Sequence, residues 1–510
     1  MKLTIDELLK KYYGYGSFRP GQAEIIDHIL GGRDICAVMP TGSGKSVCYQ
    51  IPALALPGIT LVISPLISLM QDQVRILKAA GIAAAYINSA LTPAQVSLAL
   101  QRASAGAYKI IYVAPERLES PGFISFAVRA GISLIAVDEA HCISVWGQDF
   151  RPGYRRIADF TDKLEKRPVI AAFTATANKR VRDDIVNKLR LKDPYFLTTG
   201  FDRPNLYFGT LTPEDDGFSD PKMSFILRYL ARHKDESGII YCLTKKQTET
   251  VASFLNSKGY NAGAYHAGMD NDLRRRIQED FTFGRIKLIA ATSAFGMGID
   301  KPDVRFVLHY SMPPRIEQYY QEAGRAGRDG EKAECILLYS PADYYFIKKY
   351  FILREDDGEK ESAMTPQEKE EYTAAQLDEL EKMRFYSASG RYCLRRQILH
   401  YFGEKTDSPC GNCSCCNNDI YSRCMPDKKK AGYDEELFIR LKAKALLLSM
   451  RTGVPVFAIA DDKMLRGLSE QKPKNENGLR MIPGFSTVKI RQYGREFLEI
   501  IREYDNIPKV

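Results

Sequence analysis

A glycine-rich segment carries the strongest chemical pattern in the sequence. Met39–Ser46 (MPTGSGKS) follows a short apolar run and precedes a predicted helix. Gly42 and Gly44, with Thr41 beside them, permit a tight loop whose backbone N–H groups can surround phosphate oxygens at a helix N-terminus. Lys45 can then reach the β- and γ-phosphates, and the Ser46 hydroxyl can ligate Mg²⁺. Because Met39 stands where Gly or Ala is usual, a purely structural glycine turn remains an alternative.

An acidic tetrapeptide supplies the complementary chemistry. Asp138-Glu-Ala-His141 follows the apolar run Ser133–Val137, a pattern typical of a buried strand. Asp138 is suited to binding Mg²⁺, usually through water, and Glu139 to orienting and deprotonating an attacking water. An isolated helix N-cap is the structural alternative. With a phosphate loop about 90 residues upstream, the pair indicates an enzyme that hydrolyses a nucleotide.

Cysteines are concentrated near the C-terminal third of the chain. Six of the 11 cysteines lie between Cys393 and Cys424, and no export signal precedes them, which favours a metal site over disulfides. Four of them are separated by 16, 2 and 2 residues: Cys393, Cys410, Cys413 and Cys416. Four thiolates suit a structural, tetrahedral Zn²⁺. Replacement of one ligand by Cys415 or Cys424, or a reactive dithiol instead of a metal site, remains open.

The elements that must position these residues alternate between short β-rich runs and longer helical segments over residues 30–340. This alternation is typical of parallel-sheet α/β domains. A first series of strands is predicted at Ile35–Val38, Thr60–Ser64, Lys109–Val113, Ser133–Val137 and Val169–Phe173. A second series is predicted at Gly238–Cys242, Ala262–Tyr265, Lys287–Ala291, Arg305–His309 and Glu334–Tyr339. The Pro-, Gly- and Asp-rich stretch Thr212–Lys222 is predicted to be a loop near the boundary between two lobes.

The pattern changes after Pro341. A charged loop is expected at Arg354–Tyr372, followed by helices at Ala374–Tyr386 and Arg391–Phe402, a polar linker, and an all-helical segment over 437–505. The sequence thus predicts five parts: two α/β lobes at 1–205 and 206–340, a helical zinc-binding subdomain at 341–418, a linker at 419–436, and a small all-α domain at 437–510.

Charge and hydropathy narrow the class of protein. The net charge is +9, and residues 437–510 alone hold 14 Lys and Arg against 8 Asp and Glu. This sign suits a phosphate-binding surface, although a solvated basic helical face would look the same. No apolar run approaches the roughly 18 residues of a membrane span. We therefore expect a cytoplasmic protein, nucleoid-associated if bacterial, with no membrane partner.

The order of these motifs resembles superfamily-two helicases, and specifically the RecQ family. Tyr13–Gln22 (YGYGSFRPGQ) is similar to the adenine-recognition motif of that family. The resemblance implies that Tyr15 stacks on the base, Gln22 reads its amino edge and N7, and Arg19 supports the nucleotide. A helix that merely packs on the lobe is the structural alternative. The resemblance also implies that both lobes are RecA-like.

The segment Cys142–Tyr154 (CISVWGQDFRPGY) resembles the aromatic-rich loop of RecQ helicases. The resemblance implies that unpaired bases stack on the aromatic rings and the guanidinium of this segment, which belong to Trp146, Phe150, Arg151 and Tyr154. Trp146 is the only Trp in the chain. Core packing of Trp146 is the alternative. Gln148 stands where the family usually has His, which leaves any coupling role of that side chain in doubt.

Further segments match helicase motifs. Phe173–Ala177 (FTATA) is similar to the motif that links hydrolysis to strand separation, and Ser64–Gln73 to the first DNA-backbone motif, in which Ser64 and Gln71 would contact DNA. Ser and Thr at such strand ends commonly serve as helix caps instead. Ala291–Asp300 and Gln321–Asp329 match the last two motifs. They imply that Asp300 contributes to nucleotide binding and that Arg325 and Arg328 stabilise charge on the γ-phosphoryl group. Arg328 is the better candidate for the arginine finger, and the two would share a helical face if that segment is helical.

The C-terminal part also has counterparts in the family. The cysteine spacing, with CLRRQILHYFGE between the ligands, looks like the RecQ zinc-binding subdomain. Residues 437–505 resemble an HRDC domain, whose Pro483-Gly484 turn could present N–H groups to phosphate, with Lys489 and Arg491 nearby. A protein-docking module or a stabilising cap fits this segment equally well. Only about 20 residues separate Cys416 from the next helix, too few for the winged-helix domain of many relatives.

The resemblance implies an ATP-dependent DNA helicase that uses Mg²⁺ and a structural Zn²⁺. It would translocate 3′ to 5′ on single-stranded DNA and unwind duplexes in recombination and repair. Expected partners are single-stranded and forked DNA, with single-stranded-DNA-binding or repair proteins as further candidates, and we expect a monomer. Two alternatives remain: a nucleic-acid-stimulated ATPase or remodeller that acts on RNA or lacks processive unwinding, and a non-enzymatic DNA-binding scaffold descended from a motor.

Overall fold

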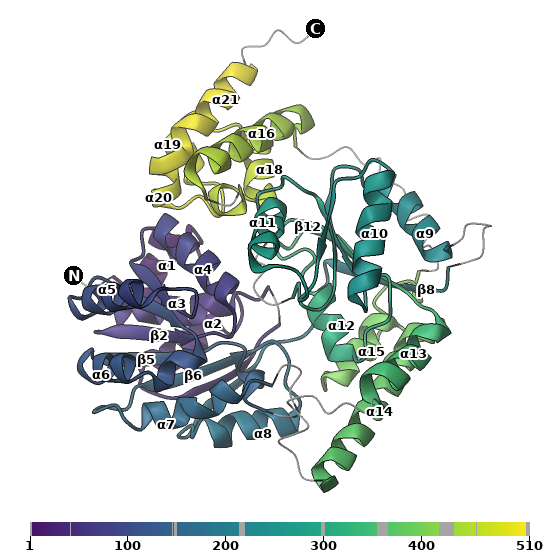
Figure 1. Cartoon of the computed structure of the whole chain (residues 1–510). Coiled ribbons are helices and arrows are strands. Elements are labelled where there is room, and N and C mark those ends of the chain that lie inside the picture. Colours follow the sequence, from purple (N-terminus) through teal and green to yellow (C-terminus); the bar gives the residue numbers. More distant parts are fainter. Residues whose placement is uncertain are drawn as a thin grey trace. The chain divides into compact units, whose positions relative to one another are not determined.

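The computed structural model describes nine stretches of the chain: 3–40, 42–144, 146, 150–213, 220–296, 301–353, 366–417, 433–454 and 456–505 (Figure 1). Contacts group the chain into two compact units. One comprises Met1–Thr199 with Ala431–Val510, and the other comprises Gly200–Lys430. Among the described residues, no helix has both the length and the apolar character needed to cross a membrane.

The first unit is built on a seven-stranded sheet in the order β3-β4-β2-β5-β6-β1-β7, in which all registered pairs are parallel. The strands are β1 Ile35–Val38, β2 Ile59–Ile63, β3 Ala84–Ile87, β4 Ile110–Val113, β5 Ile132–Val137, β6 Val169–Thr174 and β7 Tyr195–Thr198. The five predicted strands are confirmed to within a few residues. The edge strands β3 and β7 were not predicted.

Helices cover both faces of this sheet (Figure 1). They are α1 Ile5–Tyr13, α2 Gln22–Leu30, α3 Lys45–Ala55, α4 Ile67–Ala79, α5 Pro93–Ser104, α6 Pro121–Arg129, α7 Ile157–Thr161 and α8 Lys179–Lys188, with short 3₁₀ turns η1 Pro115–Glu119, η2 Ala140–Ile143 and η3 Pro152–Arg156. Alternate residues of each central strand enter opposite cores: Ile135 and Val137 of β5 face one cluster, and Leu134 and Ala136 face the other. Burial on both faces explains why these strands are uninterrupted apolar runs.

The second unit contains a six-stranded parallel sheet in the order β10-β11-β9-β12-β13-β8. Its strands are β8 Leu206–Leu211, β9 Ser237–Tyr241, β10 Ala262–Tyr265, β11 Leu288–Ala291, β12 Val304–His309 and β13 Ala333–Leu338, and its helices are α9 Pro221–Leu230, α10 Lys245–Ser257, α11 Asn271–Thr282 and α12 Ile316–Ala323. The second predicted series is confirmed, and β8 is an additional edge strand. Both expected α/β lobes are therefore present.

Helices follow the second sheet. Helix α13 (Pro341–Ile347) continues into one π-helical turn, η4 (Lys348–Ile352), and α14 (Pro366–Ala388) and α15 (Leu394–Tyr401) complete the unit. The charged loop predicted over Arg354–Tyr372 was wrong from Pro366 onward, because α14 begins there. Its residues 354–365 lie outside the described part of the chain.

The C-terminal segment forms a small helical domain with its own core. Its helices are α16 Glu435–Thr452, α17 Val456–Ile459, α18 Asp462–Gln471, α19 Glu476–Leu479, α20 Thr487–Lys489, the π turn η5 Ile490–Gly494 and α21 Arg495–Asp505. Apolar side chains from α16, α18 and α21 meet in that core. Within the first unit, the Gly484–Ser486 turn contacts Gly14, where a Cβ would lie 2.6 Å from the Ser486 nitrogen. The Phe485 and Ser486 N–H groups donate to the Ile482 and Gly484 carbonyls, at 3.1 and 3.2 Å, whereas the sequence suggested that this turn could present N–H groups to phosphate.

Candidate nucleotide-binding, nucleic-acid and zinc sites

The phosphate loop joins β1 to α3 at the carboxyl edge of the first sheet. Gly42 and Gly44 adopt φ values of 83° and 85°, a conformation that favours glycine, and Gly44 caps the helix that begins at Lys45. The ammonium of Lys45 donates to the Met39 carbonyl at 3.0 Å. The loop therefore presents a lysine and a helix N-terminus together, which is the arrangement that binds phosphate groups. Thr41 lies outside the described residues.

The N-terminal motif is attached to this loop. The Gln22 side-chain amide donates to the carbonyls of Ser43 and Gly44, at 3.2 and 3.0 Å, and accepts from the Arg19 backbone at 2.9 Å. The Arg19 guanidinium donates to the Gly42 carbonyl. The approach is close enough that a Cβ on Gly44 would lie 2.5 Å from the Gln22 nitrogen. Two of the three predicted adenine-site residues thus hold the loop, whereas the Tyr15 ring is largely exposed.

The acidic tetrapeptide follows β5 at the same edge. β6 lies between β1 and β5, so the three strand ends bring the phosphate loop, the FTATA segment and the tetrapeptide side by side. Glu139 adopts φ 49° and ψ 47°, a left-handed conformation rare for a side chain of this type. Its Oε2 atom is buried and makes no hydrogen bond among the described residues. Strained residues of this kind are concentrated at functional sites.

The electrostatics of Asp138 fit a cation site. Burial and the neighbouring Glu139 charge raise the pKa of Asp138 to about 7, although Lys45 opposes the shift. An additional positive charge at this carboxyl group would favour its ionised form. The half-buried Ser46, in the first turn of α3 after the phosphate loop, supplies a hydroxyl. The donors present thus match the oxygen ligands that Mg²⁺ prefers.

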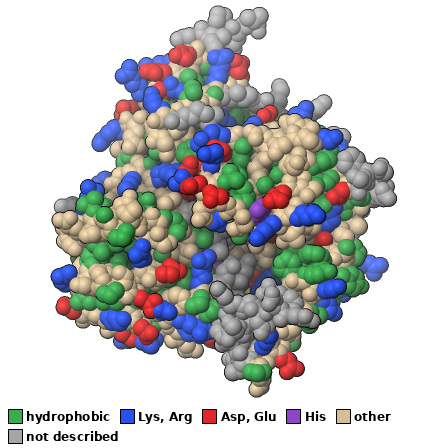
Figure 2. Space-filling view, in the orientation of Figure 1, with side chains coloured by type: hydrophobic (Ala, Val, Ile, Leu, Met, Phe, Trp, Pro, Cys, Tyr) green, Lys and Arg blue, Asp and Glu red, His purple; other side chains and the backbone are tan. Residues whose placement is uncertain are grey.

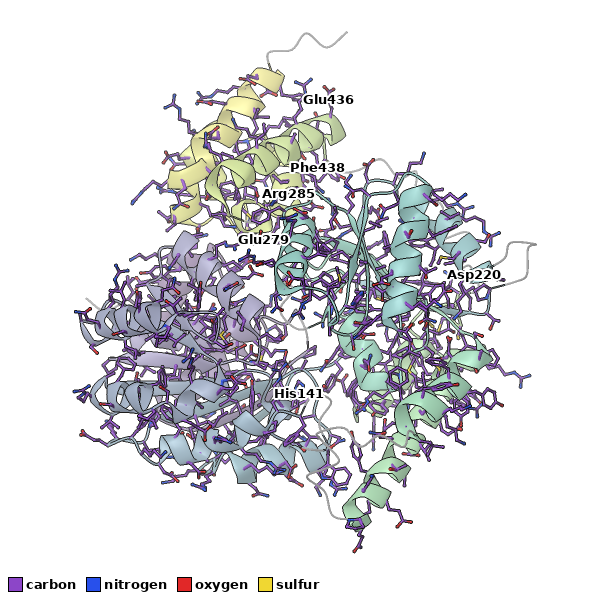
Figure 3. The ribbon with its side chains drawn as sticks, in the orientation of Figure 1. His141, Asp220, Glu279, Arg285, Glu436 and Phe438 are labelled. Atoms are coloured by element: carbon purple, nitrogen blue, oxygen red, sulfur yellow. The ribbon has the colours of Figure 1, made fainter. Side chains whose placement is uncertain are left out.

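His141 connects the tetrapeptide to the end of β6. Its Nδ1 atom lies 2.9 Å from Thr174 Oγ1 and 3.3 Å from Glu139 Oε2. Thr174 Oγ1 also donates to the Thr176 carbonyl at 3.0 Å. Figure 3 labels His141, which lies at the margin of the first lobe. The FTATA segment is thereby in direct contact with the residues expected to hydrolyse nucleotide.

The aromatic segment after the tetrapeptide is only partly accessible. The Arg180 guanidinium lies 3.3 Å from the centre of the half-buried Trp146 ring, and Arg155 lies 4.8 Å from that of Phe150. Arg151 is half-buried. Tyr154 departs from expectation: its side chain is fully buried, and its hydroxyl donates to the Asp138 carbonyl at 2.8 Å. Core packing leaves no face of this ring for a base.

Two further candidates for DNA contact differ in accessibility. Ser64 is fully buried at the end of β2, and its hydroxyl makes no hydrogen bond within the described residues. Burial therefore prevents the Ser64 side chain from reaching DNA in this structure. Gln71, on α4, is half-buried. Gln148 lies outside the described residues.

The arginines of the second lobe follow α12. That helix ends at Ala323, so Arg325 and Arg328 occupy turns and do not share the helical face considered from their spacing. Arg325 is buried beside Tyr241. Burial raises the pKa of Tyr241, and the positive charge of Arg325 partly offsets this rise. Arg328 is half-buried. Asp300, the other nucleotide candidate of this lobe, lies outside the described residues.

Four thiols converge in the zinc-binding region. The sulfur atoms of Cys393, Cys410, Cys413 and Cys416 all lie within 4.8 Å of one another. Tetrahedral Zn²⁺ with Zn–S bonds of about 2.3 Å requires sulfur separations of about 3.8 Å. The measured Cys410–Cys416 and Cys393–Cys413 separations are both 4.0 Å. These four predicted ligands therefore fit zinc.

The fifth described cysteine of this region lies outside the four-sulfur group. Cys415 Sγ donates to the Ser389 carbonyl at 3.1 Å and is not part of the four-sulfur group. The Asn412 backbone N–H donates to Cys410 Sγ at 3.3 Å, a contact that favours a thiolate. Cys424 lies outside the described residues.

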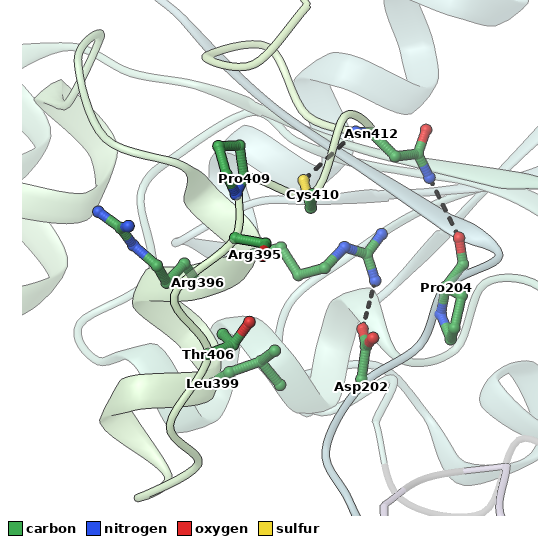
Figure 4. Close-up of a pocket in the computed structure, with 10 residues that line it drawn as sticks. Asp202, Pro204, Arg395, Arg396, Leu399, Thr406, Pro409, Cys410 and Asn412 are labelled. Atoms are coloured by element: carbon green, nitrogen blue, oxygen red, sulfur yellow. Dashed lines mark hydrogen bonds and ion pairs between the residues drawn. The ribbon is translucent and has the colours of Figure 1, made fainter.

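The zinc region is anchored to the segment just before β8, at the start of the second compact unit, by Arg395, which the sequence did not single out. Its guanidinium donates to an Asp202 carboxylate oxygen at 2.6 Å (Figure 4). It also donates to the Arg203 carbonyl at 2.6 Å and to the Leu206 carbonyl. The Asn412 amide donates to the Pro204 carbonyl at 3.1 Å. These contacts join residues about 200 positions apart, which sequence spacing cannot reveal.

Family models match most of the chain. A DEAD/DEAH box helicase model matches residues 19–185, and a helicase conserved C-terminal domain model matches 221–330. Together with the two parallel sheets, these matches define a helicase motor. A RecQ zinc-binding model matches residues 346–417, and an HRDC domain model matches 434–501. The zinc assignment of the four cysteines is thereby supported independently.

Curated relatives identify the family. The chain is 41% identical to the ATP-dependent DNA helicase RecQ of Bacillus subtilis over 98% of this chain and 79% of the relative. It is 42% identical to the Haemophilus influenzae protein of the same name, over 92% of this chain and 71% of the relative. The chain belongs to the RecQ helicase family. A mimivirus protein named as a putative ATP-dependent RNA helicase is also 41% identical, over 86% of this chain and 77% of that protein.

Solved structures support the fold. A structure of Mss116p bound to single-stranded RNA and AMP-PNP has a TM-score of 0.56 at 17% identity, covering 78% of this chain and 92% of that one. The Mycobacterium smegmatis helicase Lhr, bound to single-stranded DNA and AMP-PNP, has a TM-score of 0.53 at 20% identity, covering 65% and 47%. At these identities the likeness concerns the fold alone.

Proposed function

We propose that this protein is an ATP-dependent DNA helicase that translocates 3′ to 5′ on single-stranded DNA and unwinds duplexes during recombination and repair. The main support is that Lys45, Asp138 and Glu139 follow strands that end at the same edge of the sheet. His141, in the same segment as Asp138 and Glu139, contacts Thr174 at the end of β6, which lies between those strands. Family membership supports the polarity and the DNA substrate. We further propose the five-part division of the chain with the limits predicted from its sequence.

The nucleotide site is proposed to use the loop and the residues attached to it. Thr41, Gly42, Gly44 and Lys45 would hold the phosphates. On the adenosine side, Tyr15, Arg19 and Gln22 would act, with Gln22 offering both a donor and an acceptor. Ser46 and Asp138 would hold Mg²⁺, which when bound neutralises phosphate charge. Asp300 is retained as a further nucleotide contact.

Glu139 is proposed as the general base. Its buried Oε2 atom makes no hydrogen bond among the described residues and lies 3.3 Å from His141 Nδ1, which suits acceptance of a proton from an attacking water. Arg325 and Arg328 are proposed to stabilise negative charge on the γ-phosphoryl group. Single-stranded and forked DNA are the proposed ligands of Trp146, Phe150, Arg151 and Gln71.

A second candidate, an RNA-directed motor, has support from the mimivirus relative. Steady-state ATP hydrolysis with single-stranded DNA, with RNA of the same length and with no nucleic acid separates the two. We expect strong stimulation by DNA, weaker stimulation by RNA and little turnover alone. Preferential stimulation by RNA would support the second candidate. A rate unaffected by either polymer would overturn both.

A further inference from the structure

An exposed aromatic surface lies where the second lobe passes into the zinc-binding region. Five large apolar side chains within nine residues are strongly exposed: Tyr345 70%, Phe346 38%, Tyr350 55%, Phe351 42% and Leu353 51%. We call these five residues the aromatic platform. Figure 2 shows hydrophobic side chains gathered over α13 on the visible face. Exposed apolar patches of this kind usually mark an interaction site.

Local structure forces these rings outward. Ile347 and Ile352 are buried and anchor the segment, so the residues between and beside them face solvent. The π-helical turn Lys348–Ile352 adds a residue to the helical repeat, which places Phe346 against both following rings, with centroids 4.8 Å from Tyr350 and 6.0 Å from Phe351. Such turns occur frequently at functional sites. The platform is therefore a preformed surface.

Two cations lie within the platform segment. Lys348 and Lys349 are part of the π turn, and the Lys349 ammonium is 5.2 Å from the centre of the Tyr350 ring. Two nearby acidic groups among the described residues have cationic partners: Asp343 pairs with Lys222 at 2.9 Å, and Glu381 with Arg384 at 2.8 Å. An anionic partner with flat apolar groups would complement this surface.

We propose that the aromatic platform binds single-stranded DNA by stacking one or two bases on Tyr345 and Tyr350, while Lys348 and Lys349 contact the adjoining phosphates. Base stacking on aromatic side chains is sequence-tolerant, and lysines beside the rings track the backbone. The sequence continues with acidic residues, Glu355 to Asp357, that would repel phosphate. We therefore expect the platform to contact only a short stretch of single-stranded DNA. This inference rests on the proposed DNA helicase function but concerns a site outside the motor motifs.

Photocrosslinking of the full chain tests the platform. Single-stranded oligonucleotides carrying one 5-iododeoxyuridine at successive positions are irradiated with the protein, and the modified peptides are identified by mass spectrometry. Adducts are expected on the peptide that contains residues 341–353. An absence of adducts there at every position would overturn the proposal.

Binding measurements separate stacking from other roles of the same side chains. By fluorescence anisotropy, Tyr345→Ala with Tyr350→Ala is expected to raise the Kd for single-stranded DNA about fivefold or more. Tyr345→Phe with Tyr350→Phe, which keeps both rings, should restore it. Phe196→Ala removes an equally exposed aromatic side chain (54%) elsewhere and should leave the Kd unchanged. An unchanged Kd in the double alanine variant would overturn the platform.

Two controls identify the source of a failure. Sedimentation velocity over a range of concentrations tests a protein occupant, because self-association lost in the double alanine variant with unchanged DNA affinity would show a protein-docking surface and overturn the proposal. DNA-stimulated ATP hydrolysis is measured on the same wild-type preparation. If DNA stimulates ATP hydrolysis but the platform variants bind DNA like the wild type, only the proposed platform site is wrong. If DNA does not stimulate ATP hydrolysis, the proposed helicase function is wrong as well.

Discussion

The Oγ1 atom of Thr174 lies 2.9 Å from Nδ1 of His141, so the end of β6 and the tetrapeptide after β5 are joined by one buried side-chain contact. The same nitrogen lies 3.3 Å from the Glu139 carboxylate. A shift of the FTATA segment would therefore move the imidazole that faces the proposed general base. This contact offers a direct physical route from strand engagement to hydrolysis.

Removing the Thr174 hydroxyl should break this link. Thr174→Val keeps the shape of the side chain but removes the hydroxyl from buried His141 Nδ1, which then has only the Glu139 carboxylate at 3.3 Å, and the expected cost is about 1–3 kcal/mol. We expect fewer base pairs unwound per ATP hydrolysed, measured by parallel unwinding and phosphate-release assays. Thr198→Val at the exposed end of β7 is the matched control. If both variants unwind the same number of base pairs per ATP hydrolysed, the His141–Thr174 contact does not couple hydrolysis to unwinding.

Gln22 should set the affinity for nucleotide. In Gln22→Glu, a carboxylate oxygen replaces the amide that donates to the Ser43 and Gly44 carbonyls, and oxygen then faces oxygen. The KM for ATP is expected to rise about tenfold or more, since a buried polar group is left unpaired. Initial-rate kinetics measure this, with Gln101→Ala on the exposed face of α5 as the control. An unchanged KM would show that Gln22 does not position the loop.

The three strands absent from the sequence prediction, β3, β7 and β8, all lie at sheet edges. An edge strand has a neighbour on only one side, so its residues need not form the long apolar run that identified the central strands. β3 (AAYI) lacks a β-branched cluster, and β7 alternates between half-buried and exposed residues. Only the neighbouring strands determine that these segments extend the sheets.

Among the candidate site residues, too, local sequence patterns were informative and tertiary contacts were not predictable. Motif spacing singled out Lys45, Glu139 and the four cysteines as candidates from local order alone, and the structure brings the four cysteine sulfurs together. Spacing could not distinguish Tyr154, whose ring is buried, from Phe150 in the same segment. Nor could it pair Arg395 with Asp202 or His141 with Thr174, since tertiary packing brings those residues together.

The two adjacent cysteines should differ in their effect on zinc. Cys416→Ser removes one of the four converging sulfurs, whereas Cys415→Ser changes a side chain outside that group, which donates to the Ser389 carbonyl and lies beside Cys413. Bound metal, measured by atomic emission after dialysis, should fall well below one equivalent only in the first variant. The melting temperature should fall with it, because structural zinc contributes to folding. Loss of zinc from Cys415→Ser alone would reverse the assignment.

Asp434 should make the C-terminal helical domain sensitive to acid. Burial acts to raise the pKa of Asp434, but hydrogen bonds from Lys472 and Tyr504 outweigh it and lower the pKa to about 2. Because the folded pKa lies below the unfolded value, this stabilisation is full above about pH 4 and is lost as the pH falls toward 2. Asp434 also caps α16.

Asp434→Ala is expected to lower the free energy of unfolding by about 1–2 kcal/mol at pH 7, through loss of the cap and the ion pair. Urea titrations at pH 7 and near pH 2.5 measure the difference from wild type, which should shrink at the lower pH. Glu499→Ala, which removes an exposed pair with Arg495, should change little. If the two proteins differ in free energy of unfolding by the same amount at both pH values, ionisation of Asp434 does not stabilise the domain.

Unwinding of a forked DNA duplex by the wild type and by Glu139→Gln tests the central claim most directly. The substitution keeps the size of the side chain but removes the proposed base. The wild type should separate a fork with a 3′ single-stranded arm in the presence of ATP and Mg²⁺, and Glu139→Gln should bind the same fork but fail to separate it. Unwinding by the variant at the wild-type rate, or an inactive wild type, would contradict this account.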